Sequence, residues 1–373
     1  MRNLKSLSRR RLLTMGGAAL FLSGVSAPSL AQNRHMPLRP ATILGRWQTG
    51  NRHLVPPGVF PGGMILAGDT TIERWNTKGG QASRVWSQPQ GEAPSTFRPR
   101  IDGNLVLVSG RGFLSALSQE SGQPLWRIKP WGEEFSVPLL ADQRVFVGDG
   151  HTLRCLDANS GKDIWAAKII EGIKIHYSPA IKDGVVYLCP GDGILHAFDS
   201  ESGKELWSFD NAEAWQYLRQ MYFWKDVLVG GGYHDEMWGL STKDGKVLWR
   251  FVAGNFLNSH LVWGNGVYFW SPTGWIYKLS PEYGTVSWRH KTVTYFKENP
   301  ENWAPLMAEL MAANGRIFCL DMKSVLHVLD DASGDETHRL GLPTVRHFIV
   351  PEADGQTAWL GTVPGELLLI SVG

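Results

Sequence analysis

The sequence predicts an all-β protein that folds as an eight-bladed β-propeller. Three observations indicate this fold. A hairpin motif that ends in Trp recurs at a nearly constant interval, a second hairpin precedes each copy, and helical periodicity is almost absent. Each repeat therefore forms a sheet of four antiparallel strands. A single sheet of this kind cannot bury both of its faces, so we expect the sheets to stack as blades around an axis.

The repeated hairpin is clearest at residues 197–207, which read AFDSESGKELW. Residues that alternate with period two lead into a Ser/Glu/Gly turn, and Gly203 supplies the positive φ that a tight hairpin needs. In six copies this Gly lies four residues before the closing Trp or His, and a looser copy ends at Trp86. The steps between successive closing residues are 40, 39, 42, 42, 39 and 50.

Closure of the ring depends on the two ends of the chain. Residues 350–373 supply inner strands but no outer strand, whereas residues 41–49 form a strand that carries Trp47. We expect this N-terminal strand to complete the last blade, because pairing removes an open sheet edge. Seven whole blades and one composite blade make eight. The alternative is a seven-bladed ring with an unattached N-terminal strand. Residues 303–314 form the one plausible helical run and coincide with the longest step.

The A-x-D-x-x-x-G-K-x-x-W hairpin resembles the PQQ-like repeat of quinoprotein alcohol dehydrogenases. The resemblance covers nearly all of residues 41–373 and implies that each closing Trp packs between neighbouring blades as a clamp. A Trp suits this role because it buries a large apolar area and can donate its indole N–H to a neighbouring backbone. His338 departs from the pattern. The expected clamps are Trp47, Trp86, Trp126, Trp165, Trp207, Trp249 and Trp288.

The first 31 residues resemble an export signal of the twin-arginine type. Arg9 and Arg10 lie in the sequence SRRRLL, a mild apolar run follows, and SLA at 29–31 is a small-residue cleavage site. An ordinary secretory signal is the alternative. We expect residues 32–40 to be an extension and 41–373 to be a single propeller domain. No Cys follows the cleavage site, so a periplasmic protein without a lipid anchor is expected.

Charge and cysteine content exclude several classes of function. The chain has 37 basic and 35 acidic residues, and five of the basic ones lie in the signal, which leaves 32 against 35. No basic stripe or basic–aromatic module indicates nucleic acid binding. Cys155, Cys189 and Cys319 lie in separate strands without zinc-type spacing. Free buried thiols are expected, and a pairing of Cys155 with Cys189 stays open.

The innermost strands supply the candidate functional residues. When these strands are aligned through the turn that follows each one, polar side chains fall just before them and are expected to converge at one mouth of the channel. Unpartnered burial of such groups would be costly. They either form a pocket for an anionic or polar ligand or neutralise one another. The candidate ligand-binding residues are Arg98, Ser178, Arg219, His260 and Glu309, with Gln220 as an alternative to Arg219.

The family resemblance raises pyrroloquinoline quinone with calcium as a cofactor, and hence a quinone-dependent alcohol or sugar dehydrogenase. These dehydrogenases are longer, and their alcohol-oxidising members commonly hold the quinone against a disulfide between adjacent cysteines, which this chain lacks. Glu309 is the one acidic residue placed in the inner-strand register. Residues 233–236 (YHDE) could ligate a metal only from a loop, since adjacent strand residues point to opposite faces. We therefore predict no catalytic residue, no metal site and no cofactor.

The chain is also similar to the BamB-type outer-membrane assembly scaffold in length, blade count and export, although it lacks the lipid-bearing Cys. This resemblance implies a cofactor-free propeller. We expect a monomeric, exported scaffold that binds an envelope protein partner, with no membrane-spanning segment in the mature chain. The loops at 210–214 and 295–303 are candidate contact segments.

Overall fold

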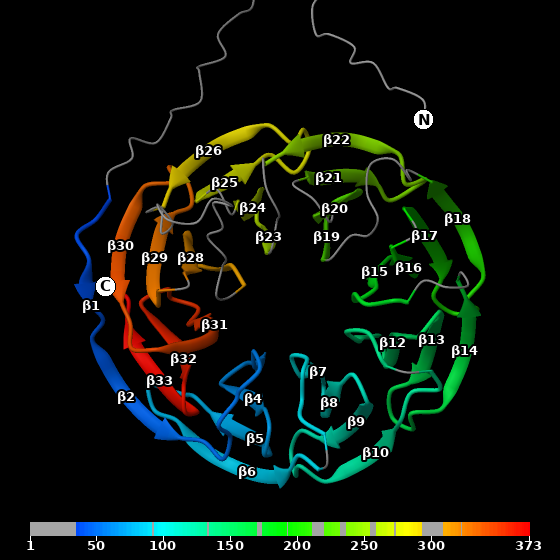
Figure 1. Cartoon of the computed structure of the whole chain (residues 1–373), viewed down its shortest axis with the longest axis horizontal. Coiled ribbons are helices and arrows are strands. Elements are labelled where there is room, and N and C mark those ends of the chain that lie inside the picture. Colours follow the sequence, from blue (N-terminus) through cyan, green and yellow to red (C-terminus); the bar gives the residue numbers. More distant parts are fainter. Residues whose placement is uncertain are drawn as a thin grey trace, which may run out of the picture.

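The strands of the computed structural model form a ring of eight sheets around a central channel (Figure 1), which confirms the predicted all-β propeller. No α-helix occurs among the residues that the structure describes. The described residues are 35–91, 93–132, 134–169, 174–191, 193–210, 220–231, 236–253, 259–271, 274–292, 309–321 and 323–373.

Each of the first four blades contains four consecutive antiparallel strands, from the channel outward. Blade one consists of β3 (Gly58–Phe60), β4 (Gly63–Ala67), β5 (Thr71–Asn76) and β6 (Ser83–Pro89); blade two of β7 (Arg100–Asp102), β8 (Leu105–Gly110), β9 (Phe113–Ser118) and β10 (Pro124–Ile128); blade three of β11 (Leu139–Ala141), β12 (Arg144–Asp149), β13 (Thr152–Asp157) and β14 (Asp163–Lys168); and blade four of β15 (Ala180–Lys182), β16 (Val185–Leu188), β17 (Ile194–Asp199) and β18 (Glu205–Asp210).

The remaining blades follow the same order, except that the last two also receive N-terminal strands. Blade five consists of β19 (Met221–Trp224), β20 (Val227–Gly231), β21 (Glu236–Ser241) and β22 (Val247–Val252); blade six of β23 (His260–Trp263), β24 (Gly266–Ser271), β25 (Trp275–Leu279) and β26 (Val286–Lys291); blade seven of β27 (Met311–Ala313), β28 (Arg316–Leu320), β29 (Val325–Asp330), β30 (Glu336–Gly341) and β1 (Arg39–Pro40); and blade eight of β31 (Val345–Pro351), β32 (Thr357–Thr362), β33 (Glu366–Ser371) and β2 (Ile43–Gln48).

The ring closes through β2, which pairs antiparallel with β33 from Ile43 opposite Ile370 to Gln48 opposite Glu366. The composite eighth blade is therefore confirmed, and the seven-bladed alternative is wrong. A second N-terminal strand was not expected. β1 pairs in parallel with β30, the outermost strand of blade seven, so part of the predicted extension lies along the rim of the ring.

The predicted helix at 303–314 is wrong where the structure describes it. Residues 303–308 lie outside the described ranges, and Met311–Ala313 is strand β27. The reason is the turn that follows. Asn314 and Gly315 both have positive φ, 45° and 72°, which is the backbone of a two-residue hairpin rather than a helix. The apolar run before this turn pairs with β28 and becomes the innermost strand of its blade.

The hydrophobic core lies between the blades. Eight clusters of buried side chains occur, and each joins two neighbouring blades. Phe146 of blade three, for example, shares a cluster with Phe198 of blade four. The two central strands of every blade are accordingly buried on both faces, so blade contact supplies most of the apolar burial that stabilises the ring.

Six of the seven closing Trp residues contact the hairpin turn of the next blade. Trp47 is the exception, and its ring packs against Trp359 of its own blade with the centroids 5.3 Å apart. Trp126 Nε1 donates a hydrogen bond to the Ala158 carbonyl at 2.8 Å, and a Cβ on Gly161 of the same turn would lie 2.7 Å from the Trp126 ring. The turn Gly therefore supplies positive φ and also leaves room for the neighbouring indole. The same hydrogen bond to the next turn is donated by Trp86 (to Gln119), Trp165 (to Ser200), Trp249 (to Pro281) and Trp288 (to Asp331).

His338 occupies the one closing position without Trp, and the structure gives a reason. The third and fourth strands of blade eight, β33 and β2, come from opposite ends of the sequence, so no hairpin turn joins them. The turn Gly on which an indole would lie is therefore missing. His338 instead lies beside Gly373, where a Cβ would be 2.4 Å from Nε2.

The three cysteines are buried, and none of them forms a disulfide. Cys155 lies in the cluster between blades three and four, whereas Cys189 lies in the cluster between blades four and five. These side chains face different interfaces, so the pairing of Cys155 with Cys189 that the sequence left open does not form. Burial raises the pKa of Cys155 to about 12, which keeps the thiol protonated and unreactive.

Replacing a clamp should destabilise the ring. Trp249 is buried and bonds to the next blade, so Trp249→Ala is expected to lower the free energy of unfolding by about 3–5 kcal/mol. Trp249→Phe should keep much of the packing and lose mainly the hydrogen bond, about 1 kcal/mol. Leu248→Ala is the control because Leu248 is 52% exposed. Urea unfolding measures all three, and equal effects at positions 248 and 249 would contradict the clamp.

Candidate functional site

Three of the five predicted channel residues meet at one cavity of about 610 Å³. It is bordered by the innermost strands β7, β11, β15 and β19 and the segments that enter them, together with one residue ahead of β3 and one ahead of β27. Arg98, Ser178 and Glu309 line it. Arg219 lies outside the described residues, and the alternative Gln220 lines the cavity.

An ion pair crosses the channel at this cavity. Arg98 Nη2 donates to Glu309 Oε2 at 2.5 Å, and the two residues belong to blades two and seven, which are not neighbours. Both side chains are partly exposed, Arg98 by 28% and Glu309 by 40%, so solvent weakens their attraction. The pair neutralises two of the predicted site residues and joins distant parts of the ring.

Arg100 is a site residue that sequence reasoning missed. It lines the same cavity, and its pKa is lowered by burial and then by the nearby charge of Arg98. The Nε atoms of Arg98 and Arg100 are both buried without a hydrogen-bond partner. Two guanidinium groups thus face the single carboxylate among the described lining residues, Glu309, which leaves the cavity with excess positive charge. Strand alternation could have revealed Arg100, since residues two apart share a face.

His260 does not line the cavity. It is buried behind Tyr222, with the two rings edge to face and their centroids 5.2 Å apart. Burial lowers the pKa of His260 to about 4, although hydrogen bonds with the backbone of Gln220 and Val229 oppose the shift. Burial, followed by the charge of Glu309, raises the pKa of Tyr222 to about 12. Both groups are therefore neutral near pH 7 and form an uncharged wall beside the ion pair.

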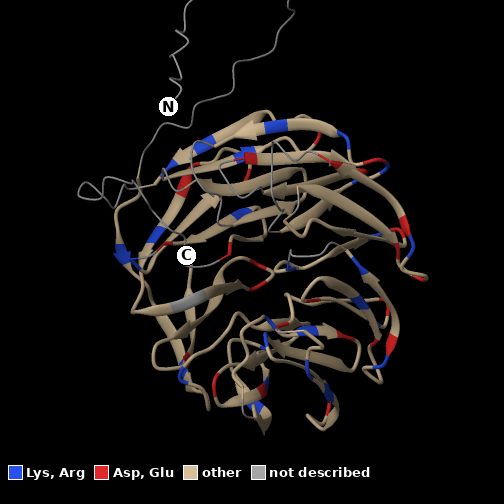
Figure 2. Cartoon of the chain, turned by 45° about the vertical axis from the view of Figure 1, so that its right-hand side comes forward, with Lys and Arg blue, Asp and Glu red and all other residues tan. Residues whose placement is uncertain are grey.

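A second surface of interest runs around the outside of the ring. The residue before the closing Trp is apolar and 44–52% exposed in blades one to five, where the outermost strands carry Val85, Leu125, Ile164, Leu206 and Leu248. We call these five residues the apolar rim. The equivalent residues of blades six to eight are the polar Ser287, Thr337 and Arg46. Elsewhere Lys and Arg are interspersed with Asp and Glu (Figure 2), so no single-sign charge dominates that view.

The repeats match a known family over most of the chain. The family described as outer membrane protein assembly factor BamB matches residues 68–188, 110–250, 191–298 and 239–372. The chain belongs to this PQQ-like repeat family. It is 30% identical over 132 residues to BamB of Marinobacter adhaerens, 25% over 209 residues to that of Shewanella oneidensis, and 33% over 110 residues to that of Escherichia coli.

These alignments cover 35%, 51% and 26% of this chain and only 33%, 49% and 28% of the three relatives. The repeat also occurs in proteins of another kind. The serine/threonine-protein kinase AfsK of Streptomyces griseus is 27% identical over 170 residues, which are 41% of this chain and 21% of the kinase. Membership of the repeat family therefore establishes the architecture of this chain but not an activity.

Solved structures agree with the fold. BamB of Moraxella catarrhalis aligns with a TM-score of 0.66 at 16% identity and covers 89% of this chain and 98% of its own. Sqt1 of Saccharomyces cerevisiae aligns with a TM-score of 0.70 at 10% identity, covering 90% of this chain and all of its own. At such low identity these similarities describe the propeller alone.

The buried His260 should make stability depend on pH. Its pKa of about 4 in the folded protein lies below the ordinary value of 6.5, so the unfolded chain takes up this proton first as the pH falls. The free energy of unfolding should decrease between pH 6.5 and 4, by about 3 kcal/mol from this group. His260→Gln should remove that part of the slope. Urea unfolding across this range measures it, with His53→Gln, whose side chain is exposed, as the control. Identical slopes in wild type and His260→Gln would refute the assignment.

Proposed function

We propose that this chain is a protein-binding propeller of the bacterial cell envelope that serves outer-membrane assembly as a scaffold rather than as an enzyme. The observation that carries the proposal is the family match, which extends over residues 68–372, together with relatives named as outer membrane protein assembly factor BamB. A closed propeller suits such a role because its rigid ring displays loops and rim strands without needing to change shape.

The apolar rim supports a protein partner. Five exposed apolar side chains follow one another over blades one to five, on strands whose outer edges carry no further strand among the described residues. A partner that lies along these strands would cover the five side chains, and burial of their apolar surface would favour its binding. The candidate contact loops at 210–214 and 295–303 lie outside the described residues, apart from Asp210, and remain part of the proposal.

The alternative function, a quinone-dependent oxidoreductase, does not fit the residues at the channel. A quinone bound through calcium needs several oxygen ligands, and calcium favours carboxylates. Among the described residues around the cavity, Glu309 is the one carboxylate, and Arg98 already binds it. The cysteines lie in separate blades and offer no adjacent pair. We therefore propose no step that involves the quinone.

We also propose that the protein acts in the periplasm as a monomer, without a lipid anchor, after export directed by residues 1–31. Arg9 and Arg10 of the signal support the export, and Gln32, which stands where a lipid-bearing Cys would follow residue 31, supports the missing anchor. In the described part of the chain, no helix has the length and apolar character needed to span a membrane.

Charge placed in the apolar rim should release the partner. The double variant Leu125→Glu/Leu206→Glu is expected to lower the recovery of envelope partners by roughly 10-fold or more, since burying an unpaired carboxylate at an interface is costly. Ser287→Glu is the matched control, because Ser287 is the equivalent exposed polar residue of blade six.

Photo-crosslinking in cells from position 164, a rim position that neither variant alters, followed by mass spectrometry, provides the measurement. Recovery of outer-membrane assembly proteins that is lost in the double variant and kept in the control supports the proposal. Equal recovery from all three proteins contradicts it. Robust dye reduction by the protein with pyrroloquinoline quinone, calcium and an alcohol would overturn the non-catalytic role.

The excess positive charge of the cavity favours a second binding role. We propose that it receives an acidic side chain or a chain-terminal carboxylate of the partner, because two guanidinium groups face one carboxylate there. Binding of a fluorescent hexaglutamate peptide, measured by anisotropy, should weaken about 10-fold in Arg100→Gln and decline with added salt.

Arg111→Gln is the control for this test, because Arg111 is exposed and pairs with Glu134 away from the cavity. A hexalysine peptide should not bind. Equal losses in Arg100→Gln and Arg111→Gln would show that peptide binding is a general surface effect and would remove the cavity from the proposal.

A further inference from the structure

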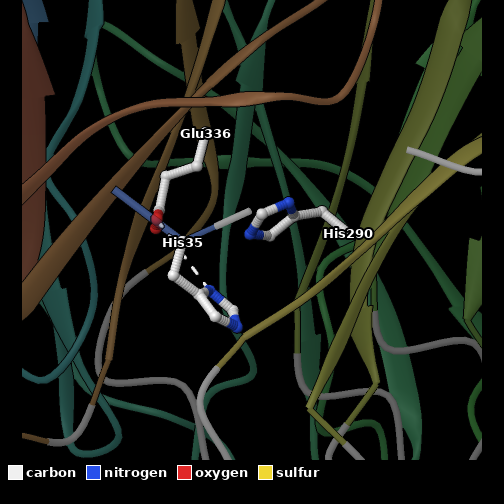
Figure 3. Close-up of side chains that lie close together, drawn as sticks. All are labelled: His35, His290 and Glu336. Atoms are coloured by element: carbon white, nitrogen blue, oxygen red, sulfur yellow. Dashed lines mark ion pairs between the residues drawn. The ribbon is translucent and has the colours of Figure 1, made fainter. Parts of the chain in front are cut away.

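Three side chains that are far apart in the sequence meet at the rim between blades six and seven. His35 precedes β1, His290 lies on β26, and Glu336 begins β30 (Figure 3). Each offers one ligand atom, and these atoms all lie within 4.8 Å of one another. His35 Nδ1 is 4.0 Å from Glu336 Oε2, and the His35 and His290 ring centroids are 5.7 Å apart.

His290 is the unusual member of this cluster. Its side chain is completely buried, yet neither Nδ1 nor Nε2 has a hydrogen-bond partner. A buried imidazole without a partner is costly, and native structures rarely leave one unsatisfied without a reason. One ring nitrogen of His290 is turned toward Glu336 and His35 (Figure 3), so the orphaned atom points at the place where a ligand would complete it.

Glu336 is held in position by a second layer of polar contacts. Its Oε1 lies 2.7 Å from His327 Nδ1, and His327 Nε2 lies 3.2 Å from Asp321 Oδ2, with all three side chains buried. The other oxygen, Oε2, accepts a hydrogen bond from the Met36 backbone N–H at 2.7 Å. An oriented carboxylate behind which a His and an Asp are aligned resembles the outer shell that supports ligands in metal sites.

We propose that His35, His290 and Glu336 bind a divalent transition-metal ion of the zinc type. Two imidazoles and one carboxylate form a ligand set that zinc accepts, with a fourth position left for water. The nitrogen ligands argue against calcium and magnesium, which prefer oxygen, and the absence of a thiolate from the set argues against copper(I).

Such an ion would fasten the N-terminal segment to the ring. β1 contributes only two residues to the edge of blade seven, and the hydrogen bond from Met36 is the next contact before it. Metal ligation by His35 would add a strong bond at the start of the described chain and would join it to blades six and seven at once. The bound ion would thus connect the segment before β1 to blades six and seven.

Other blades also have an interacting polar pair between their third and fourth strands, but without the two additional histidines of blade seven. His327 and Glu336 are nine residues apart, as are His196 and Glu205 in blade four and Arg154 and Asp163 in blade three, and each of these pairs interacts between the third and fourth strands. Among the described residues, only the pair of blade seven has two further histidines beside it, His35 and His290. Blade four therefore supplies a matched control.

The test uses untagged full-length protein that has been stripped of metal with a chelator. Equilibrium dialysis against zinc should give one ion per chain, and cobalt should give the visible bands of a four-coordinate ion. His35→Ala and His290→Ala should each weaken zinc binding by about 10-fold or more, since loss of an outer-shell partner alone costs 10- to 100-fold. Zinc should raise the thermal midpoint of the wild type and not that of His35→Ala.

His196→Ala should bind zinc as tightly as the wild type. His35 lies in the edge segment outside the ring, so His35→Ala tests the site even if His290→Ala fails to fold. Substoichiometric binding by the wild type overturns the proposal, as does binding that is unchanged in His35→Ala. Equal losses in His35→Ala and His196→Ala also overturn it, because they would show that zinc binds to scattered surface histidines.

Discussion

The structure depends on the contact between a closing Trp and the turn Gly of the next blade. A Cβ on that Gly would lie 2.7 Å or less from an indole atom in several blades, so only Gly lets the two blades approach. The indole N–H then satisfies a turn carbonyl that would otherwise face an apolar interface. One residue pair thus fixes the hairpin, the spacing between blades and the hydrogen bonding of the seam. The pair recurs at six of the eight seams, while the two seams of blade eight close without it.

Much of this architecture could be predicted from the sequence, because the repeat is local and regular. The hairpins, the blade number and the pairing of β2 with β33 all follow from the spacing of Gly and Trp and from the missing outer strand of the last blade. The helix expected at 303–314 failed for a local reason. The apolar run ends at a two-residue turn with positive φ, and a turn of that type requires a strand before it.

The sites were predicted less completely, since they are assembled from separate blades. Alignment of inner strands brought Arg98, Ser178 and Glu309 to one cavity, but it could not reveal that Tyr222 stands between His260 and that cavity. The cluster of His35, His290 and Glu336 escaped sequence reasoning altogether. Its members share no motif spacing, and they meet only because β1 pairs with β30, the outermost strand of blade seven. β1 has only two residues, which is too short for a sequence pattern to predict the pairing.

The pairing of β2 with β33 has a consequence for how the protein is made. Thr49 Oγ1 donates to the Gly365 carbonyl across 316 positions of sequence, so the seam cannot form until β33 has left the ribosome. Seven blades are synthesised before their ring can close, and the first strand must wait for the last. During that interval blades one and seven each expose a face that later packs against blade eight. Exposed apolar faces and unpaired edges favour misassembly. The newly made chain is thus most vulnerable just before β33 emerges, and the pairing of β2 with β33 then closes the ring.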